Sequence, residues 1–307
     1  MSSAVNRPVH VPVMPREVIQ WLRIQPGQTV MDGTLGAAGH SRLILKALNG
    51  TGRLIGFDRD PMMLAYAEQN LRQEPLSDSI QLSLIHASYA ESRERLAERS
   101  IAGVDRILLD LGLSSDQLSD QGRGFGFDAG GPLDMRFDIS RGRPASELLA
   151  KTSQEELTSI FETYGEEPAS RQIAAEIVRR RQTGQLISTA EQLEEVILST
   201  LRHSRDGSGR NPATKVFQAL RIAVNQELDH VERMFDEVLP AILNPGGIVV
   251  VLTFHSLEDR IVKNAFKGLQ GWQILTKTPV EASPAEIRLN PRSRSAKLRA
   301  AQKHSVP

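Results

Sequence analysis

Three glycines, Gly33, Gly36 and Gly39, follow an aspartate in the segment MDGTLGAAGHS. They lie between a predicted strand and a predicted helix, where backbone N–H groups at the helix N-terminus can bind a ligand without obstruction by a Cβ atom. The next predicted strand ends in GFDRD and carries Asp58, where doubly wound nucleotide-binding folds present a carboxylate to ribose hydroxyls. The loop and the carboxylate together favour an adenosine-containing ligand. The alternative is that Asp58 only caps the helix that begins at Pro61.

Two later strand ends also carry polar side chains. The run RILLD places Asp110 at the carboxyl end of its strand, and open α/β sheets bind ligands outside such ends, so we expect Asp110 in the crevice of the glycine loop. Turn formation is the alternative role for this carboxylate.

The segment FHSLEDR presents His255, Ser256, Glu258 and Asp259 directly after another strand. A metal site is one interpretation, but a capping box between Ser256 and Asp259 is favoured, and we assign no metal.

The hydrophobic pattern predicts the elements that position these residues. From about residue 28 to 112, short β-branched runs alternate with amphipathic segments, which indicates a βαβαβαβ order and a parallel sheet. A stretch rich in Gly, Asp and Arg then breaks the alternation. Residues 153–201 have helical spacing, with capping boxes expected at Ser153 and Thr189. A long helix is expected from about 215 to 243, after which IVVVLTF resumes the strands.

The predicted fold class is therefore α/β, a doubly wound Rossmann-like sheet interrupted by an all-helical domain. We place the first part of the sheet domain at residues 1–114, the inserted domain at 115–212 and the second part, with a basic tail, at 213–307. For the tail, and for the arginines at 179–181, solvated surface and phosphate contact are equally favoured. The tail cations are Arg288, Arg292, Arg294, Lys297, Arg299 and Lys303.

Composition narrows the class of protein further. Lys+Arg and Asp+Glu are balanced at 37 each, so electrostatic attraction to nucleic acid would have to come from local patches. The absence of cysteine removes disulfide scaffolds and thiolate metal sites. Apolar runs of signal-peptide or membrane-spanning length are also absent from the sequence. We therefore expect a soluble cytoplasmic protein with no membrane partner.

The chain closely resembles the bacterial small-subunit rRNA cytosine-N4 methyltransferase family. The likeness runs from about residue 10 to 299 and rests on eight ordered motifs: HVPVM, DGTLGAAGHS, FDRDP, LLDLGLSS, GRGFGF, GPLDMR, FQALRIAVNQEL and TFHSLEDRIVK. It implies a class I methyltransferase sheet with a helical substrate-recognition domain, and S-adenosylmethionine as the cofactor. The implied substrate is the N4 amine of one cytidine in the decoding region of 16S rRNA, with the small ribosomal subunit as partner. The oligomeric state stays open, a homodimer included.

Carried over by motif, the cofactor contacts are expected in the glycine loop, at the ribose and along the crevice. They are Gly36, Ala38, Gly39, His40, Asp58, Tyr89, Asp110 and Gln117. The sequence departs from the common family pattern at Ala37 and Ala38, and at Tyr89, where phenylalanine is common, which affects contact details. The Asp/Asn-Pro-Pro-aromatic segment of many amino-methyltransferases is replaced by DLGLSS. The usual catalytic assignment therefore does not transfer.

Asp110 is the first candidate for catalysis. The lone pair of a cytosine amine is delocalised into the ring, so an acceptor for an amine hydrogen, and then for the proton, should help the transfer. Asn225, His255 and Ser256 are weaker candidates. Two other functions are considered: an oxidoreductase dependent on NAD, which the same glycine loop would suit, and a non-catalytic rRNA-binding ribosome-assembly factor.

The target base must be unstacked to reach such a crevice, which favours a loop or an opened strand as substrate. The segments GRGFGF and GPLDMR are candidates for a lid over it. Phe125 or Phe127 could stack on the base, and buried packing of both rings is the equally favoured alternative.

Overall fold

The chain divides into two compact units, each described here by itself. The sheet unit comprises Met1–Ser114 and Asp229–Pro307, and the helical unit comprises Ser115–Leu228. In the computed structural model the described residues are 11–75, 77–127, 131–201 and 211–304. Within these ranges no helix has the length and apolar character needed to cross a membrane.

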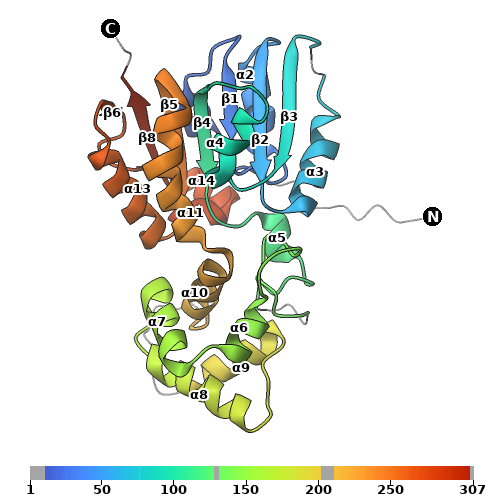
Figure 1. Ribbon diagram of the computed structural model, residues 1–307, viewed down its shortest axis with the longest axis vertical. Helices are drawn as coiled ribbons and strands as arrows, with labels where there is room; N and C mark the ends of the chain where they lie inside the picture. The colour runs from blue at the N-terminus through green and yellow to red at the C-terminus, as the bar shows by residue number, and fades with distance from the viewer. Residues whose placement is uncertain (1–10, 76, 128–130, 202–210, 305–307) are drawn as a thin grey trace, which may run out of the picture. The chain divides into compact units, whose positions relative to one another are not determined.

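The sheet unit is built on one mixed sheet (Figure 1). Its order is β3-β2-β1-β4-β5-β8-β6, and β7 pairs with β8. The first five strands of this order are parallel, whereas β8 runs antiparallel to β5, β6 and β7. The strands are β1 (Thr29–Asp32), β2 (Gly52–Asp58), β3 (Ile80–His86), β4 (Val104–Asp110), β5 (Leu243–Thr253), β6 (Trp272–Ile274), β7 (Val280–Glu281) and β8 (Lys297–Lys303).

Both faces of the sheet are buried. Successive side chains of a strand point to opposite faces, and accordingly Val30 and Leu108 belong to one hydrophobic core while Met31 and Leu109 belong to the other. A strand buried on both sides reads as a continuous apolar run, as RILLD and IVVVLTF do. The expected doubly wound α/β class is confirmed.

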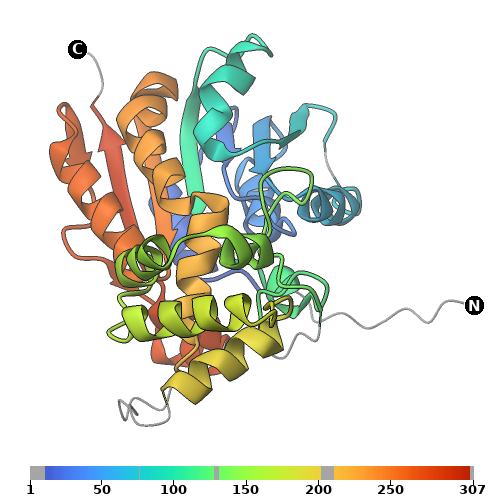
Figure 2. The ribbon, with the colours of Figure 1, turned by 60° about the horizontal axis from the view of Figure 1, so that its bottom comes forward.

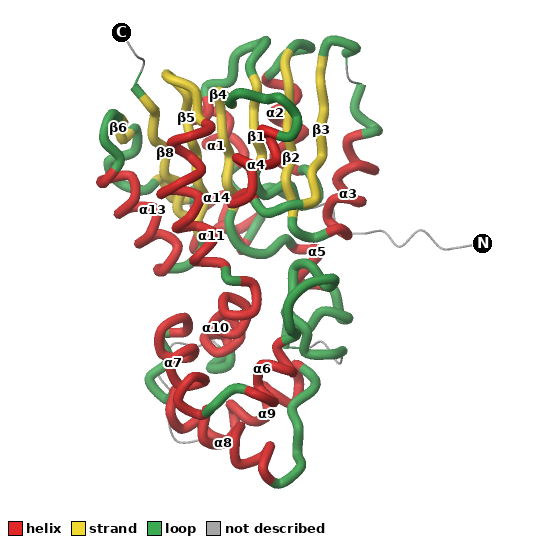
Figure 3. Tube along the Cα trace, in the orientation of Figure 1, coloured by secondary structure: helices red, strands yellow, loops and turns green. Residues whose placement is uncertain are grey.

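Helices cover each face of the sheet (Figure 3). One core includes side chains from α1 (Pro15–Leu22), α2 (Gly39–Ala47), α3 (Pro61–Leu71) and α14 (Pro284–Leu289). The other core is closed by α4 (Ser92–Ala97), α11 (Glu227–Arg233), the π-helical turn η2 (Met234–Val238), α12 (Leu239–Ile242) and α13 (Ser256–Gly268). Two short 3₁₀ turns complete the unit, η1 (Tyr89–Glu91) and η3 (Pro291–Ser295).

The helical unit has its own apolar core. Leu157, Phe161, Ile173, Leu193 and Val196, which the helical spacing predicts on inward faces, are all buried. The helices α8 and α9 lie side by side (Figure 2). The Thr189 capping box is present, while the Ser153 cap lacks a return bond from Glu156 among the described contacts. The helices are α5 (Ser115–Ser119), α6 (Ala145–Lys151), α7 (Gln154–Gly165), α8 (Ser170–Gln182), α9 (Ala190–Thr200) and α10 (Thr214–Asn225).

The long helix expected from about 215 to 243 is not continuous. Gln226 adopts a left-handed conformation with φ 51° and ends α10, and a new helix begins at Glu227. The α10 helix packs on α7 in the helical unit, although the sequence analysis assigned residues 213 onward to the sheet domain. Apolar periodicity carries on through the break, and a polar residue in a left-handed turn leaves no distinct signal in it.

The basic tail is also more ordered than its composition indicates. Residues 297–303 form β8, which lies between β5 and β6 inside the sheet. Leu298, Ala300 and Ala301 are fully buried. In the sequence, cations interrupt these apolar residues, so the tail contains no long apolar run. The strand was therefore not predicted from the hydrophobic pattern.

Candidate functional site

The carboxyl ends of β1, β2 and β4 lie at one edge of the sheet and each ends in an aspartate. These are Asp32, Asp58 and Asp110. Each carboxyl is largely withdrawn from water, and burial raises its pKa, to about 6 for Asp32 and about 7 for the other two. Three acidic groups that are costly to ionise thus gather at the edge where open α/β sheets bind ligands.

The glycine loop connects Asp32 to α2. Gly36 has φ +50°, and a Cβ added there would meet no heavy atom within 4 Å. Ala38, also left-handed at φ 68°, is the N-cap of α2, and no side chain of the described residues caps this helix end. Gly33 is tightly enclosed, because a Cβ would lie 2.5 Å from Leu109 Cδ2 and 3.0 Å from Tyr89 Cβ. The loop therefore needs Gly33 for its own packing and leaves open space beside Gly36.

Asp58 holds the loop from the next strand. Its Oδ2 accepts a hydrogen bond from Gly36 N at 2.8 Å, and its Oδ1 accepts one from Asp60 N at 2.9 Å. The cap of α3 is Asp60, whose Oδ1 accepts from Met62 N. The alternative role for Asp58, as the cap of that helix, is therefore wrong.

Asp110 faces the start of α2. Its Oδ2 lies 3.5 Å from His40 Nε2, and its side chain is 19% exposed. Its backbone N donates to Thr34 Oγ1 at 2.6 Å. Within the part of the chain that the structure describes, Asp110 Oδ1 is buried and has no hydrogen-bond partner. After burial, the negative charge of Asp32 contributes most to the raised pKa of Asp110.

Asp32 is a site residue that the sequence analysis missed. It is 1% exposed, and its two oxygens accept from Ser41 Oγ at 2.7 Å and from Thr34 N at 3.2 Å. It thereby ties both ends of the glycine loop together. The signal was available, because the strand-end argument that selected Asp58 and Asp110 applies equally to the aspartate of QTVMD.

Tyr89 follows β3 at the start of η1 and is 9% exposed. Its ring meets that of His230 edge to face, with 6.4 Å between centroids. The preceding Ser88 Oγ lies 2.5 Å from His230 Nδ1. Burial lowers the pKa of His230 to about 4, so this imidazole is neutral near pH 7. These contacts fix Tyr89 beside Gly33.

The segment FHSLEDR caps α13, but with different residues from those expected. His255 is the N-cap and forms the capping box with Glu258, whose Oε2 accepts from Phe254 N at 2.9 Å. Asp259 instead pairs with Arg299. Ser256 is the first helical residue. No group of side chains suited to hold a metal ion occurs within the described ranges.

Gln117 and Asn225 belong to the helical unit. Gln117, in α5, is 5% exposed. The Asn225 amide donates to Met135 O at 2.7 Å and to Arg221 O at 2.9 Å, and its carbonyl accepts from Phe137 N at 2.8 Å. Asn225 therefore anchors the GPLDMR segment to α10.

The two phenylalanines of GRGFGF make contacts inside the helical unit. Phe125 is 6% exposed and stacks on Phe137, with 5.8 Å between centroids. Phe127 meets Phe217 edge to face at 4.7 Å. The alternative of buried packing thus describes Phe125, whereas Phe127 is only half-buried.

Several cations that could have contacted phosphate are used within the fold. Arg299 forms a buried bidentate pair with Asp259, and Lys303 Nζ donates to two backbone carbonyls. In the helical unit, Arg179 and Arg180 pair with Glu176, and Arg181 donates to the carbonyls that end α6. Arg288 and Arg294, by contrast, have exposed side chains.

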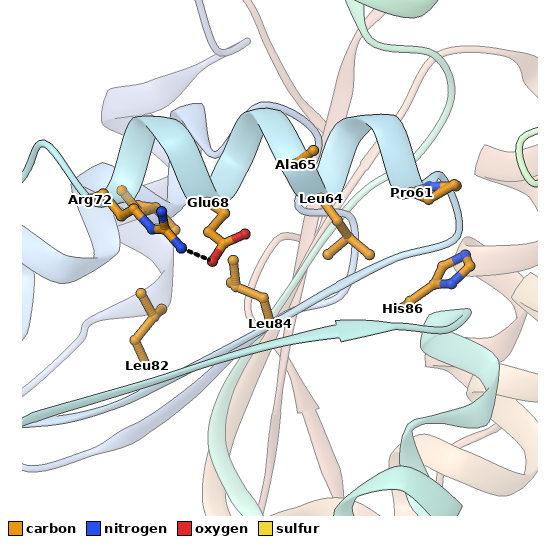
Figure 4. Close-up of a pocket in the computed structure, with 9 residues that line it drawn as sticks. Pro61, Leu64, Ala65, Glu68, Arg72, Leu82, Leu84 and His86 are labelled. Carbon is orange, nitrogen blue, oxygen red and sulfur yellow. Dashed lines mark hydrogen bonds and ion pairs between the residues drawn. The ribbon is translucent and has the colours of Figure 1, made fainter.

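A shallow groove lies elsewhere on the sheet unit, between α3 and the edge strand β3 (Figure 4). Leu64, Leu82 and Leu84 line it, and Arg72 donates to Glu68 at 2.6 Å at its rim. None of the predicted site residues lines this groove. The site that the sequence predicts is the carboxyl edge of the sheet.

Known proteins resemble this chain over nearly its whole length. The model of the MraW methylase family matches residues 7–304. A relative from Sorangium cellulosum, named ribosomal RNA small subunit methyltransferase H, is 44% identical and covers 96% of this chain and 90% of its own. The relative of the same name from Koribacter versatilis is 46% identical, covering 95% and 93%. A solved SAM-dependent O-methyltransferase from Thermotoga maritima is 9% identical, with a TM-score of 0.40 over 95% of this chain and 65% of that one.

Proposed function

The chain belongs to the MraW methylase family, and from that premise we propose that it methylates the N4 amine of one cytidine in the decoding region of 16S rRNA. The methyl donor is S-adenosylmethionine. The names of the two relatives support an rRNA substrate in the small subunit. The observation that carries the choice of an amine is Asp110, a strand-end carboxyl with a buried, unbonded oxygen at the binding edge. Because the chain belongs to a methylase family, the alternative function as an NAD-dependent oxidoreductase is excluded.

The residues at the carboxyl edge fit the cofactor. The open space beside Gly36 and the uncapped N-terminus of α2 accept a close ligand, as a cradle without Cβ atoms should. Asp58 is the proposed partner of the ribose hydroxyls. The cofactor carries a sulfonium, so the acidic groups Asp32, Asp58 and Asp110 complement its positive charge. When bound, it supplies an activated methyl group.

In the proposed reaction, Asp110 acts as the acceptor. A hydrogen bond from the amine to the Asp110 carboxylate would localise the nitrogen lone pair, and the same carboxylate would take the proton as the N–C bond forms and the S–CH₃ bond breaks, with S-adenosylhomocysteine as the leaving group. His40 Nε2 lies 3.5 Å from the other oxygen, so a protonated His40 would favour the carboxylate form of Asp110. Alignment of the amine with the methyl group supplies several kcal/mol of the acceleration.

The exposed tail arginines are the proposed contacts for the rRNA backbone. Arg288 and Arg294 lie on α14 and η3, which precede the antiparallel strand β8 and therefore stand at the carboxyl edge of the sheet. Phosphate contacts of this kind release counterions and give a salt-dependent affinity. Replacing both arginines by glutamine should raise KM for rRNA, lower the salt slope and leave kcat nearly unchanged.

The direct experiment is methyl transfer from labelled S-adenosylmethionine to small subunits that lack the modification and to naked 16S rRNA, with nucleoside analysis of the product. N4-methylcytidine from either substrate supports the proposal and identifies the accepted form. If neither becomes labelled although the cofactor binds, the assembly-factor function is favoured. In that case Asp110→Ala should leave subunit assembly intact.

A further inference from the structure

We infer that Arg292 is a positioning residue for the proposed methyl transfer. Its guanidinium joins the C-terminal segment to the loop after β4 and provides the positive charge that keeps Asp110 available as a base. This inference rests on the proposed function for its catalytic meaning. Its physical content, a charge effect on the Asp110 carboxyl, can be measured without it.

The topology brings Arg292 to Asp110 from far away in sequence. Because β8 runs antiparallel to β5, its first residue pairs with Thr253 at the carboxyl end of β5, and Asp110 pairs with Leu252 one residue earlier. The 3₁₀ turn η3 directly precedes β8. The segment that carries Arg292 is therefore placed at the edge of the sheet where β4 ends.

A direct contact connects the two segments. Arg292 Nη2 donates to the backbone carbonyl of Leu113, three residues after Asp110. Between these residues the chain leaves the sheet through Gly112, which has φ +94°, a conformation that only glycine adopts readily. Glycine allows this turn more than one backbone conformation. The hydrogen bond from Arg292 to Leu113 therefore helps to fix the conformation of the turn.

Arg292 itself is rigidly supported. The next residue, Ser293, is fully buried, and both its N and its Oγ donate to Asn290 O, at 3.0 and 2.8 Å. The Asn290 side chain donates in turn to Val11 O at 3.2 Å. The donor to Leu113 is therefore presented from a fixed turn and not from a loose tail.

The charges around Asp110 give Arg292 a specific effect. From β1, Asp32 raises the pKa of Asp110, and from α13, Glu258 raises it as well. His40 approaches from α2. Of the charges on described residues, Arg292 is the cation that lowers the pKa of Asp110, although burial is the largest influence and raises that pKa to about 7. Without Arg292, less carboxylate would be present at neutral pH.

The neighbouring cations are engaged differently. Lys297 and Arg299 both pair with Asp259. Arg294, two residues away, is exposed. A role in setting the state of Asp110 is thus particular to Arg292 among the cations of η3 and β8.

The pH–rate profile of methyl transfer tests the inference. In Arg292→Gln the acid limb, which reports deprotonation of Asp110, should move to higher pH by about one unit, the lower end of what an opposite charge does to a neighbouring carboxyl. Arg292→Lys keeps the charge and should leave the limb in place while lowering the maximal rate. The matched control Arg72→Gln makes the same change of net charge at the C-cap of α3, where the side chain is 75% exposed, and should leave the profile unchanged.

A carboxyl ¹³C NMR titration of Asp110, in the protein without rRNA, separates this inference from the proposed function. The midpoint should rise in Arg292→Gln and stay at the wild-type value in Arg292→Lys. Equal midpoints in all three proteins, or equal shifts in both variants, would overturn the inference. If the wild type methylates no rRNA but the midpoint still moves as stated, the proposed function fails and the charge effect stands. If Arg292→Gln does not fold, a displaced midpoint in Arg292→Lys is sufficient to refute it.

Discussion

Nε2 of His40 lies 3.5 Å from Oδ2 of Asp110, and both side chains are largely buried. The first residue belongs to the helix after the glycine loop and the second to the end of a strand far along the chain. The cofactor loop and the proposed proton acceptor are thus in contact. Because Asp110 is the proposed acceptor of the amine proton, a change in its charge is expected to affect the rate of methyl transfer more than cofactor binding.

Asp110→Asn tests the acceptor role. The substitution preserves size but removes the base, so the rate of methyl transfer should fall by about 10²- to 10⁴-fold. Because the pKa of Asp110 is raised to about 7, the wild-type rate should increase with pH through 7, and this limb should be absent from the residual activity of the variant. Calorimetry with S-adenosylhomocysteine provides the control, since affinity should change much less than rate. A variant that keeps the limb would assign it to another group.

Gly33→Ala and Gly36→Ala form a matched pair in one loop. A Cβ at residue 33 would lie 2.5 Å from Leu109 Cδ2, so Gly33→Ala should destabilise the fold by about 1–3 kcal/mol. A Cβ at residue 36 meets nothing, and its left-handed conformation costs about 1–2 kcal/mol. The space beside Gly36 is the proposed site of the cofactor, and a Cβ would occupy it. Gly36→Ala should therefore reduce cofactor affinity by more than the strain in the loop alone accounts for. Thermal unfolding and calorimetry measure the two effects, and an unaltered affinity in Gly36→Ala would place the cofactor elsewhere.

Asp58 should have two separable functions. It binds Gly36 N and Asp60 N within the protein, and the proposal adds a contact to the ribose. Asp58→Ala should weaken cofactor binding by at least about tenfold, as loss of a charged hydrogen-bonding group does. A 2′-deoxy or 3′-deoxy analogue of S-adenosylhomocysteine isolates the ribose contact. The wild type should bind the analogue less tightly than S-adenosylhomocysteine, whereas Asp58→Ala should bind the two equally. If the losses of binding free energy from the variant and from the analogue are additive, Asp58 does not contact the ribose.

The Arg299–Asp259 pair should be a determinant of stability. Arg299 Nε and Nη2 donate to the two Asp259 oxygens at 2.7 and 3.1 Å, and both side chains are nearly buried. Arg299→Ala removes both hydrogen bonds and leaves Asp259 with Lys297, at 3.6 Å, as its other ion-pair partner among the described residues, so it should lower the free energy of unfolding by about 1.5–3 kcal/mol. The exposed neighbour provides the comparison, since Arg294→Ala should change it by less than about 0.5 kcal/mol. Similar denaturation midpoints for the two variants would show that the pair contributes little.

The three strand-end aspartates, Asp32, Asp58 and Asp110, should make the fold less stable as pH rises. Their pKa values, about 6 for Asp32 and about 7 for Asp58 and Asp110, exceed the ordinary value, so the folded protein binds more protons than the unfolded chain above about pH 4. Their contribution is complete below that pH and is lost as pH rises through 6 and 7. The unfolding temperature without cofactor should fall between pH 5.5 and 8, and Asp32→Asn should reduce the slope. A rise over this interval would show that the carboxylates are better stabilised than their burial implies.

The parts of the site that were predictable from sequence are those set by local rules. A strand followed by glycines and a helix, as at residues 29–47, predicts a ligand-binding loop in α/β folds. The carboxyl ends of the strands at Asp58 and Asp110 predict the same binding edge. Family likeness then gave the cofactor and the reaction class. The same rule covers Asp32, which ends β1 directly before Gly33.

The remainder depended on tertiary structure. Nothing local shows that His255, and not Ser256, caps its helix, because histidine is an uncommon cap and both positions have an acidic residue three residues later, Glu258 for His255 and Asp259 for Ser256. The contact of Arg292 with Leu113 and the ion pair of Arg299 join residues distant in sequence. Without those contacts, a basic tail resembles a nucleic-acid-binding surface.

The position of β8 has a consequence for synthesis of the protein. Strands β4 and β5 are separated in sequence by the whole helical unit, and β5 gains its second neighbour only when residues 297–303 have been made. A nascent chain halted before that point would present an apolar, unpaired strand edge, the kind of surface that promotes aggregation. The helical unit is one continuous segment and has no such dependence. The helical unit is therefore expected to complete its folding before β8 is synthesised and joins the sheet.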